Sequence, residues 1–162
     1  MALTVGQMQI LKIDITITRA SAVYLGQTLL QWWSGGADGI LAAFYNQQAA
    51  SLIQLWKPAV LTDALVNALV MSEFLSLTVA RQNGWFVMTQ PATVDATQAR
   101  VRQNFVDIFG GAATTTANLV TASQKAATYL ESLFTSVAGT AFTSPIFGET
   151  ATATLIADVR GV

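Results

Sequence analysis

Residues 56–109 read WKPAVLTDALVNALVMSEFLSLTVARQNGWFVMTQPATVDATQARVRQNFVDIF, and this stretch decides the fold that the sequence predicts. Thr62 or Asp63 is a plausible N-cap. The apolar residues that follow form a band wider than one stripe: Leu65, Val66, Leu69, Val70, Phe74 and Leu77. Such a band predicts one long helix, buried on most sides. Pro91 marks a turn, after which a second helix folds back with one apolar face: Val101, Phe105, Ile108 and Phe109.

The segments on either side of this stretch also have helical spacing. Thr4 followed by Gln7 is a capping-box pattern, which predicts a helix to about Asp14. Further helices are predicted over 21–33, 39–55 and about 115–137, with glycine pairs at 35–36 and 110–111 as breaks. We therefore expect a mainly α fold, a helical bundle of about five helices, in a first domain over residues 1–138.

The composition changes from residue 139 to the end. Glycines and a proline precede a run from Thr150 to Ile156 in which apolar residues and threonines alternate with period two. This pattern predicts an extended, strand-like C-terminal arm over 139–162. An unpaired strand is either disordered or completed by another chain. We expect the arm to bind a partner through its large apolar side chains: Phe142, Ile146, Phe147, Leu155 and Ile156.

The surface of this protein is expected to lie against other subunits. Hydrophobic residues make up 52% of the chain and charged residues only 10%, whereas soluble domains have about 25% charged residues. A membrane location is not expected, because the most apolar window, 59–80, contains Asp63, Asn67 and Glu73. Extensive contact between subunits is the other way to cover such a surface.

Residues with catalytic chemistry are scarce. The chain has no cysteine and no histidine, which removes disulfides, thiolate metal sites and the commonest general base. Asp63 and Glu73 are ten residues apart, nearly three helical turns, so an acid–base pair is less well supported than a capping role for Asp63. We expect no enzyme activity, no catalytic site, no cofactor and no metal.

A nucleic-acid site is not expected either. The net charge is −1 and the basic residues are scattered, whereas phosphate binding needs a basic surface. Arg100 and Arg102 are therefore interpreted as surface residues or partners in ion pairs between subunits. Trp32, Trp33 and Trp56 could stack on bases or sugars, but large aromatic residues at helix ends usually anchor cores or interfaces.

Several short motifs resemble a family of small helical proteins encoded among the head and neck genes of tailed bacteriophages. The opening LT-x-x-Q-x-x-x-LK-x-DI of that family is matched by Leu3, Thr4, Gln7, Leu11, Lys12, Asp14 and Ile15. A YN…W-basic segment is matched by Tyr45, Asn46, Trp56 and Lys57. The segment from Thr18 to Gly36 departs from the family in being unusually apolar. No functional residues carry over, because the matching positions are not chemical.

The resemblance implies a virion structural protein, made in the host cytoplasm and located at the head–tail interface. We expect a head–tail connector, or adaptor, that forms a homo-oligomeric ring of about twelve copies and binds the portal and the tail or neck proteins. Two alternatives stay open. One is a capsid decoration, collar or tail-associated subunit, and the other is a helical coat protein that packages RNA, with Arg81, Arg100 and Arg102 facing the nucleic acid.

Overall fold

The protein is mainly helical, as the sequence predicts. The computed structural model describes residues 3–49, 53–111, 113–138 and 141–162. The chain divides into two compact units. Unit 1 comprises Met1–Ile53, Ala126–Ser136 and Ser144–Val162, and unit 2 comprises Gln54–Lys125 and Val137–Thr143. Residues 144–162 therefore belong to the same unit as the N-terminal helices, whereas the sequence placed residues 139–162 in a domain of their own.

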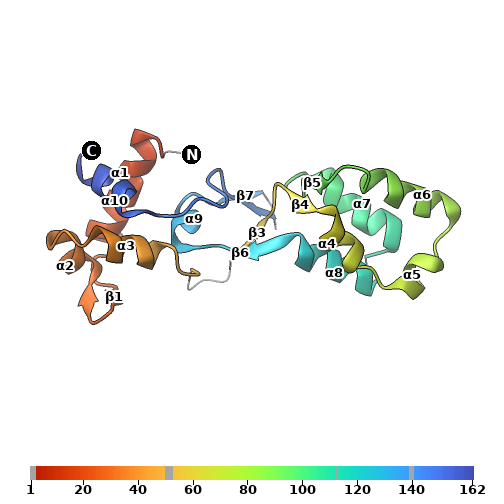
Figure 1. Ribbon diagram of the computed structural model, residues 1–162, viewed down its shortest axis with the longest axis horizontal. Helices are drawn as coiled ribbons and strands as arrows, with labels where there is room; N and C mark the ends of the chain where they lie inside the picture. The colour runs from red at the N-terminus through yellow and green to blue at the C-terminus, as the bar shows by residue number, and fades with distance from the viewer. Residues whose placement is uncertain (1–2, 50–52, 112, 139–140) are drawn as a thin grey trace. The chain divides into compact units, whose positions relative to one another are not determined.

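Unit 1 is built from short helices and one β-hairpin (Figure 1). Its elements are α1 (Val5–Ile13), a turn of π-helix η1 (Asp14–Thr18), strands β1 (Val23–Tyr24) and β2 (Gln27–Thr28), and the helices α2 (Leu29–Ser34), α3 (Asp38–Tyr45), α9 (Tyr129–Leu133) and α10 (Ala153–Arg160). The hairpin replaces the first part of the helix predicted over 21–33. Leu25 and Gly26, both with positive φ, form its two-residue turn.

Three capping boxes begin helices of unit 1. Thr4 and Gln7 form the first, confirming the sequence prediction, and Thr28 with Gln31 begins α2 in the same way. Thr128 and Glu131 form the third, at the start of α9. In each box the threonine oxygen and the residue three positions later satisfy backbone N–H groups that the helix itself leaves without partners. These local bonds explain why helices as short as α9 are stable in this fold.

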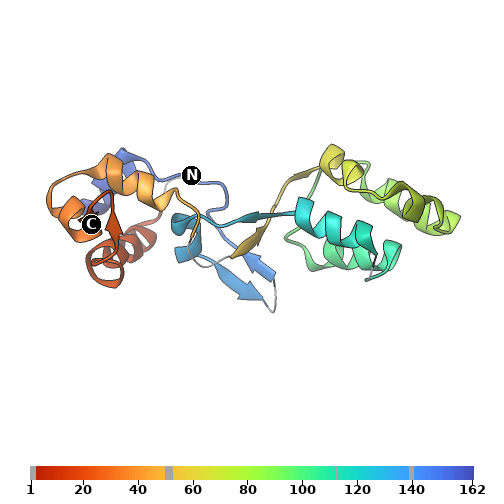
Figure 2. The same ribbon diagram turned by 90° about the horizontal axis from the view of Figure 1, so that it is seen from below.

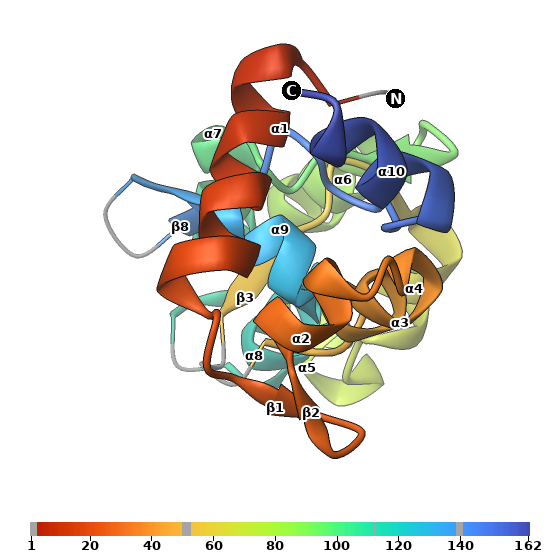
Figure 3. The same cartoon turned by 90° about the vertical axis from the view of Figure 1, so that its left-hand side faces the viewer.

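The prediction of a strand over Thr150–Ile156 is wrong. Thr152 accepts a hydrogen bond from the Leu155 N–H at 3.1 Å and caps α10. Ile156 and Val159, three residues apart, are fully buried in the core of unit 1. In Figure 3, α10 lies beside α1 and above α3, and both helices contact it. Thr152 is one of the threonines that suggested extended backbone. Threonine is also favoured as a helix N-cap, and this is its role at the start of α10.

Other contacts fix the C-terminal segment in unit 1. Arg160 forms an ion pair with Asp38 at 2.7 Å, and its guanidinium lies 4.1 Å from the centre of the Trp33 ring. The amide of Asn46 donates to the carbonyl of Ala151 and accepts from its N–H. These bonds join residues more than a hundred positions apart. They place residues 151–160 against the N-terminal helices, so this part of the predicted arm is integrated in the fold.

Unit 2 combines five helices with short strands. Its elements are β3 (Gln54–Trp56), β4 (Val60–Leu61), α4 (Thr62–Asn67), α5 (Met71–Leu75), α6 (Val79–Met88), β5 (Thr93–Val94), α7 (Ala99–Phe109), α8 (Thr114–Ala122) and β8 (Ala141–Thr143). Strands β6 (Gln124–Ala126) and β7 (Ser136–Ala138) begin or end at the unit boundary. The four-stranded sheet has the order β6-β3-β8-β7, and β3 is parallel to β8. Figure 2 shows α7 and α8 side by side.

The long central helix predicted from Thr62 onward is instead three helices, α4, α5 and α6. The break before α5 is satisfied by α8, because Thr115 accepts from the Val70 N–H at 3.0 Å and Asn118 donates to the carbonyl of Ala68. The next break ends at Thr78, whose hydroxyl caps α6. Side chains that bond locally to the backbone compete with helix continuation. The apolar band that was predicted for one long helix is therefore divided among α4, α5 and α6.

The second predicted helix of this stretch is confirmed as α7, with Phe105, Ile108 and Phe109 buried in the core of unit 2. Gly110, at φ +95°, ends it as the sequence indicated. The N-cap of α7 is Gln98. The helix predicted over about 115–137 is also wrong in part: α8 ends at Ala122, and β6 and α9 follow.

Glu131 ties together two segments of unit 1. It is fully buried, and its carboxylate accepts from the Thr128 N–H at 3.0 Å and from the Gly148 N–H at 2.6 Å. The first bond closes the capping box of α9, and the second holds the chain that leads to α10. A buried carboxylate is tolerated only when such partners satisfy it.

Replacing Glu131 by alanine is expected to destabilise unit 1 strongly. Two partly buried N–H groups lose their hydrogen bonds to a charged acceptor, which costs about 2–5 kcal/mol in the free energy of unfolding. The matched control is Gln31→Ala, which removes the same capping-box position from an exposed helix start and costs about 0.5–1 kcal/mol. Urea unfolding followed by circular dichroism measures both variants. Equal losses in the two would contradict the role assigned to Glu131.

Candidate functional site

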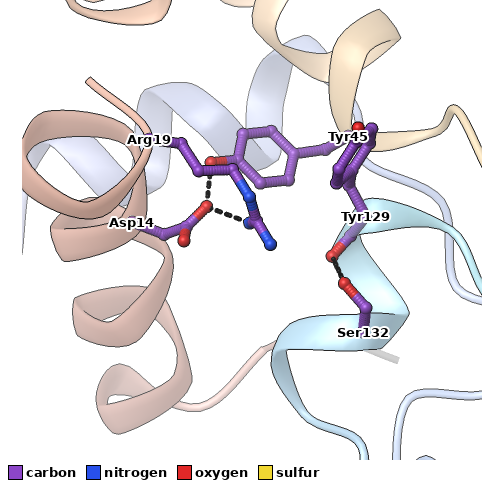
Figure 4. A network of polar contacts seen from close by, with 5 residues as sticks. All are labelled: Asp14, Arg19, Tyr45, Tyr129 and Ser132. Carbon is purple, nitrogen blue, oxygen red and sulfur yellow. Dashed lines mark hydrogen bonds and ion pairs between the residues drawn. The ribbon is translucent and has the colours of Figure 1, made fainter. Parts of the chain in front are cut away.

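A polar network around Asp14 is the most prominent cluster of charged and hydroxyl groups in unit 1 (Figure 4). Asp14 is buried, and one of its carboxylate oxygens accepts from both the Tyr45 hydroxyl and the Arg19 guanidinium. Arg19 in turn lies 5.1 Å from the centre of the Tyr129 ring, and Tyr129 stacks on Phe44 with 4.6 Å between ring centres. The network thus joins η1, α3 and α9.

The surroundings of Tyr45 keep its hydroxyl protonated. Burial raises the pKa of Tyr45 well above its usual value, and the hydrogen bond to the Asp14 carboxylate acts in the same direction. Tyr45 therefore stays a hydrogen-bond donor over the ordinary pH range. A recess of about 500 Å³ opens beside Arg19 and Tyr129, but the charge of Arg19 is already compensated by Asp14. The arrangement is suited to holding three helices together.

The residues predicted to form a partner-binding arm are not presented together on a free segment. Ile146 and Ile156 are buried in the core of unit 1, and Leu155 packs against that core. Phe147 is half-buried. The Phe142 side chain lies outside the described residues. Ile146, Leu155 and Ile156 therefore contribute to the stability of unit 1 itself.

Removal of residues 144–162 is expected to unfold the helices of unit 1, rather than to delete a dispensable arm. The truncation takes away Ile146, Ile156 and Val159 from the core and Gly148 from Glu131. In hydrogen–deuterium exchange, the amides of α1 and α3 should lose protection while those of α7 and α8 retain it. Unchanged protection of α1 and α3 would show that this segment is an appendage.

Glu73, the possible acid–base partner of Asp63, has a structural role. Its carboxylate accepts from the N–H groups of Thr114 and Thr115, at 3.0 and 2.8 Å, and so anchors the start of α8 to α5. Hydrogen bonds from Thr115, and then from Thr114, hold the pKa of Glu73 below its usual value. Asp63 is an exposed residue in the first turn of α4. The N-cap of α4 is Leu61, without a side-chain cap hydrogen bond, so the predicted cap at Thr62 or Asp63 is wrong. The two carboxylates lie on different helices, and only Glu73 bonds to a helix start.

This arrangement predicts a pH dependence for unit 2. Because the pKa of Glu73 is lower in the folded protein, its stabilising effect is present above its unfolded pKa of about 4.3 and is lost as the pH falls through the folded value. Between pH 7 and pH 3, the urea midpoint of the wild-type protein should therefore fall more than that of Glu73→Gln. Asp63→Asn is the matched control and should follow the wild type; parallel curves for Glu73→Gln and the wild type would be the contradictory result.

Most of the arginines and tryptophans considered for nucleic-acid binding make contacts within their own unit. Arg102 donates to the carbonyls of Ala96 and Thr97, and its guanidinium lies 5.0 Å from the centre of the Trp56 ring. Trp56 is buried, whereas Trp32 and Trp33 are half-buried against the core of unit 1. Arg100 is exposed and bonds to Gln98. These contacts favour the structural interpretation of Trp56 and Arg102.

Exposed apolar side chains form the candidate functional surface. On α1 and η1, Leu11 and Ile15 face the core, while Ile10, Ile13 and Ile17 are 47%, 51% and 72% exposed. The hairpin of unit 1 exposes Val23 and Leu25. In unit 2, Leu61 on β4 and Val106 on α7 are exposed, and the rest of the exposed set lies on α4, α5 and α6: Val66, Met71, Leu75, Val79, Phe86 and Val87. The sequence signalled part of this surface, because the isoleucines of the first helix occupy two different faces.

The described residues show neither a metal-binding cluster nor a membrane-spanning helix. Within residues 3–49, 53–111, 113–138 and 141–162, no three acidic, histidine or cysteine side chains are grouped so that they could hold a metal ion. None of the helices in the described part of the chain is long and apolar enough to cross a membrane.

Comparison with protein-family models, with curated proteins and with solved structures gave no match to this chain.

Proposed function

We propose that this chain is a structural subunit of a tailed-bacteriophage particle, in which it acts as a head–tail connector. The observation that carries the proposal is the apolar surface that both units leave uncovered. Large exposed apolar patches mark sites of protein association. A subunit that other proteins bind on several sides would bury such a surface against them.

The residues behind the resemblance to phage neck proteins are consistent with kinship in fold. Thr4 and Gln7 form a capping box, and Asp14 bonds to Tyr45, so the two resembling segments are joined in the core of unit 1. Asn46 holds Ala151, and Lys57 donates to the carbonyl of Ala122 at 2.7 Å. Such positions would be retained among relatives for structural reasons.

The proposed assembly is a homo-oligomeric ring of about twelve copies between portal and tail. Repeated head-to-tail contacts between copies close such a ring and cover two different surfaces on each subunit. The mechanism is mechanical: the ring joins the portal to the tail or neck proteins, and no reaction is carried out. The place of action is the virion, after synthesis in the host cytoplasm.

The role in the neck is tested with portal rings from the genome that encodes the chain. The purified protein is mixed with assembled portal and the complexes are examined by electron microscopy and by native mass spectrometry. We expect an additional ring at the tail-facing end of the portal, with a fixed copy number. Binding along the capsid or tail at high copy number would instead indicate a decoration or tail-associated subunit, and absence of binding to any particle component would contradict a virion role.

A further inference from the structure

The turn of the β1–β2 hairpin combines two features that do not stabilise the monomer. Leu25 has φ +48°, in the left-handed region that a bulky side chain avoids. Its side chain is also 68% exposed. An asparagine or a glycine would fit this turn better. The structure thus places a large apolar group where both the backbone and water disfavour it, an arrangement typical of functional positions.

The hairpin presents this group on a rigid base. Strand residues Val23 and Tyr24 pair with Thr28 and Gln27, and the Trp32 indole donates to the Tyr24 carbonyl at 2.8 Å. The Tyr24 ring packs edge-on against Phe44. Val23 and Leu25 are two residues apart and are exposed to the same extent. Figures 1 and 3 show the turn extending away from the helices of unit 1. We call Val23, Leu25 and Gly26 the hairpin tip.

A recess in unit 2 has the size and lining to receive such a tip. It has a volume of about 330 Å³ and lies between α6, the loop after it and α7. Its walls include Gly84, Val87, Met88 and Val101, and its polar lining residues include Gln98, Arg100 and Asn104. This volume is at the lower end of the range for ligand pockets, about 300–1,000 Å³, and suits one or two aliphatic side chains. An apolar centre with a polar rim is also the usual organisation of a protein interface.

The charges of the two units favour a contact between unit 1 of one copy and unit 2 of another. Unit 1 contains three basic and five acidic side chains, whereas unit 2 contains five basic and four acidic ones. Two units of opposite net charge attract, while two copies of unit 1 repel each other. The recess lining itself contains one cation, Arg100, and one carboxylate, Asp95, so the complementarity lies in the net charges of the two units. The net charges of the two units therefore favour a second copy of this chain as the partner that occupies the recess.

We propose that the hairpin tip of one copy docks in the α6–α7 recess of the next copy. Leu25 and Val23 fill the recess, and the exposed backbone of the turn meets the polar rim. The contact uses different surfaces on the two partners, so it repeats from copy to copy and either closes into a ring or extends. This inference rests on the proposed function for the ring, and it identifies the contact that would build it.

Three substitutions separate this contact from general surface effects. Leu25→Asn removes the apolar group and suits the left-handed turn, so its thermal midpoint should equal or exceed that of the wild type. Val87→Gln changes the wall of the recess at an exposed position. Ala80→Gln is the matched control, because Ala80 is an exposed apolar residue of the same helix that lies outside the recess lining.

Association is measured by sedimentation velocity over a range of concentrations. Leu25→Asn and Val87→Gln should each weaken self-association about ten- to hundredfold, the effect of one buried aliphatic side chain, and Ala80→Gln should associate like the wild type. An equimolar mixture of the first two variants should form one-to-one dimers, because one intact tip meets one intact recess. Wild-type association by both single variants, no rescue in the mixture, or a wild-type protein that stays monomeric would each overturn the proposal.

The outcomes also distinguish this contact from the connector role. If the variants and their mixture behave as expected but the wild-type protein does not bind portal rings, the contact stands and the connector role fails. If the wild-type protein binds portal and both variants associate as it does, the connector role stands and this contact is wrong.

Discussion

Two small hydrophobic cores, in place of one large one, limit how much apolar surface this chain can hide. The fraction of surface buried on folding falls as a folding unit becomes smaller, and each unit here holds about half of the chain. More than half of the residues are hydrophobic, so the interior positions are filled and large aliphatic side chains are left outside. The proposed association with other subunits would cover them.

Within each unit, a carboxylate joins segments that are distant in sequence. Glu131 holds the start of α9 and the chain at Gly148 in unit 1, and Glu73 holds the start of α8 against α5 in unit 2. Both accept from backbone N–H groups at the positions where helices leave donors without partners. With so few charged residues in the chain, these carboxylates are used to fix the chain's path. Asp14 serves the same purpose with Tyr45 and Arg19.

Local signals predicted the features that depend on local bonds. The capping box of Thr4 and Gln7, the apolar face of α7 and the stop at Gly110 could all be read from the sequence, because neighbouring residues determine them. The breaks in the central stretch could not, because Thr115 and Asn118 satisfy the backbone there from a helix far along the chain. The tail was misread since Thr152 can favour a strand or cap a helix, and only its contacts in unit 1 decide between them.

Contact between subunits stays a prediction, and several of the residues assigned to it lie in the core. Low charge predicted contact between subunits, whereas the arm residues Ile146 and Ile156 proved to be core and the exposed groups lie on α1, the hairpin and α4–α6. Hydrophobic burial would hold such an assembly together, so it should resist salt, unlike one held by surface charges. Sedimentation equilibrium of the wild-type protein at low and high ionic strength tests this. The average mass of the protein should rise with concentration, and this rise should be the same in high salt. A monomer of constant mass under both conditions would contradict association through apolar surfaces.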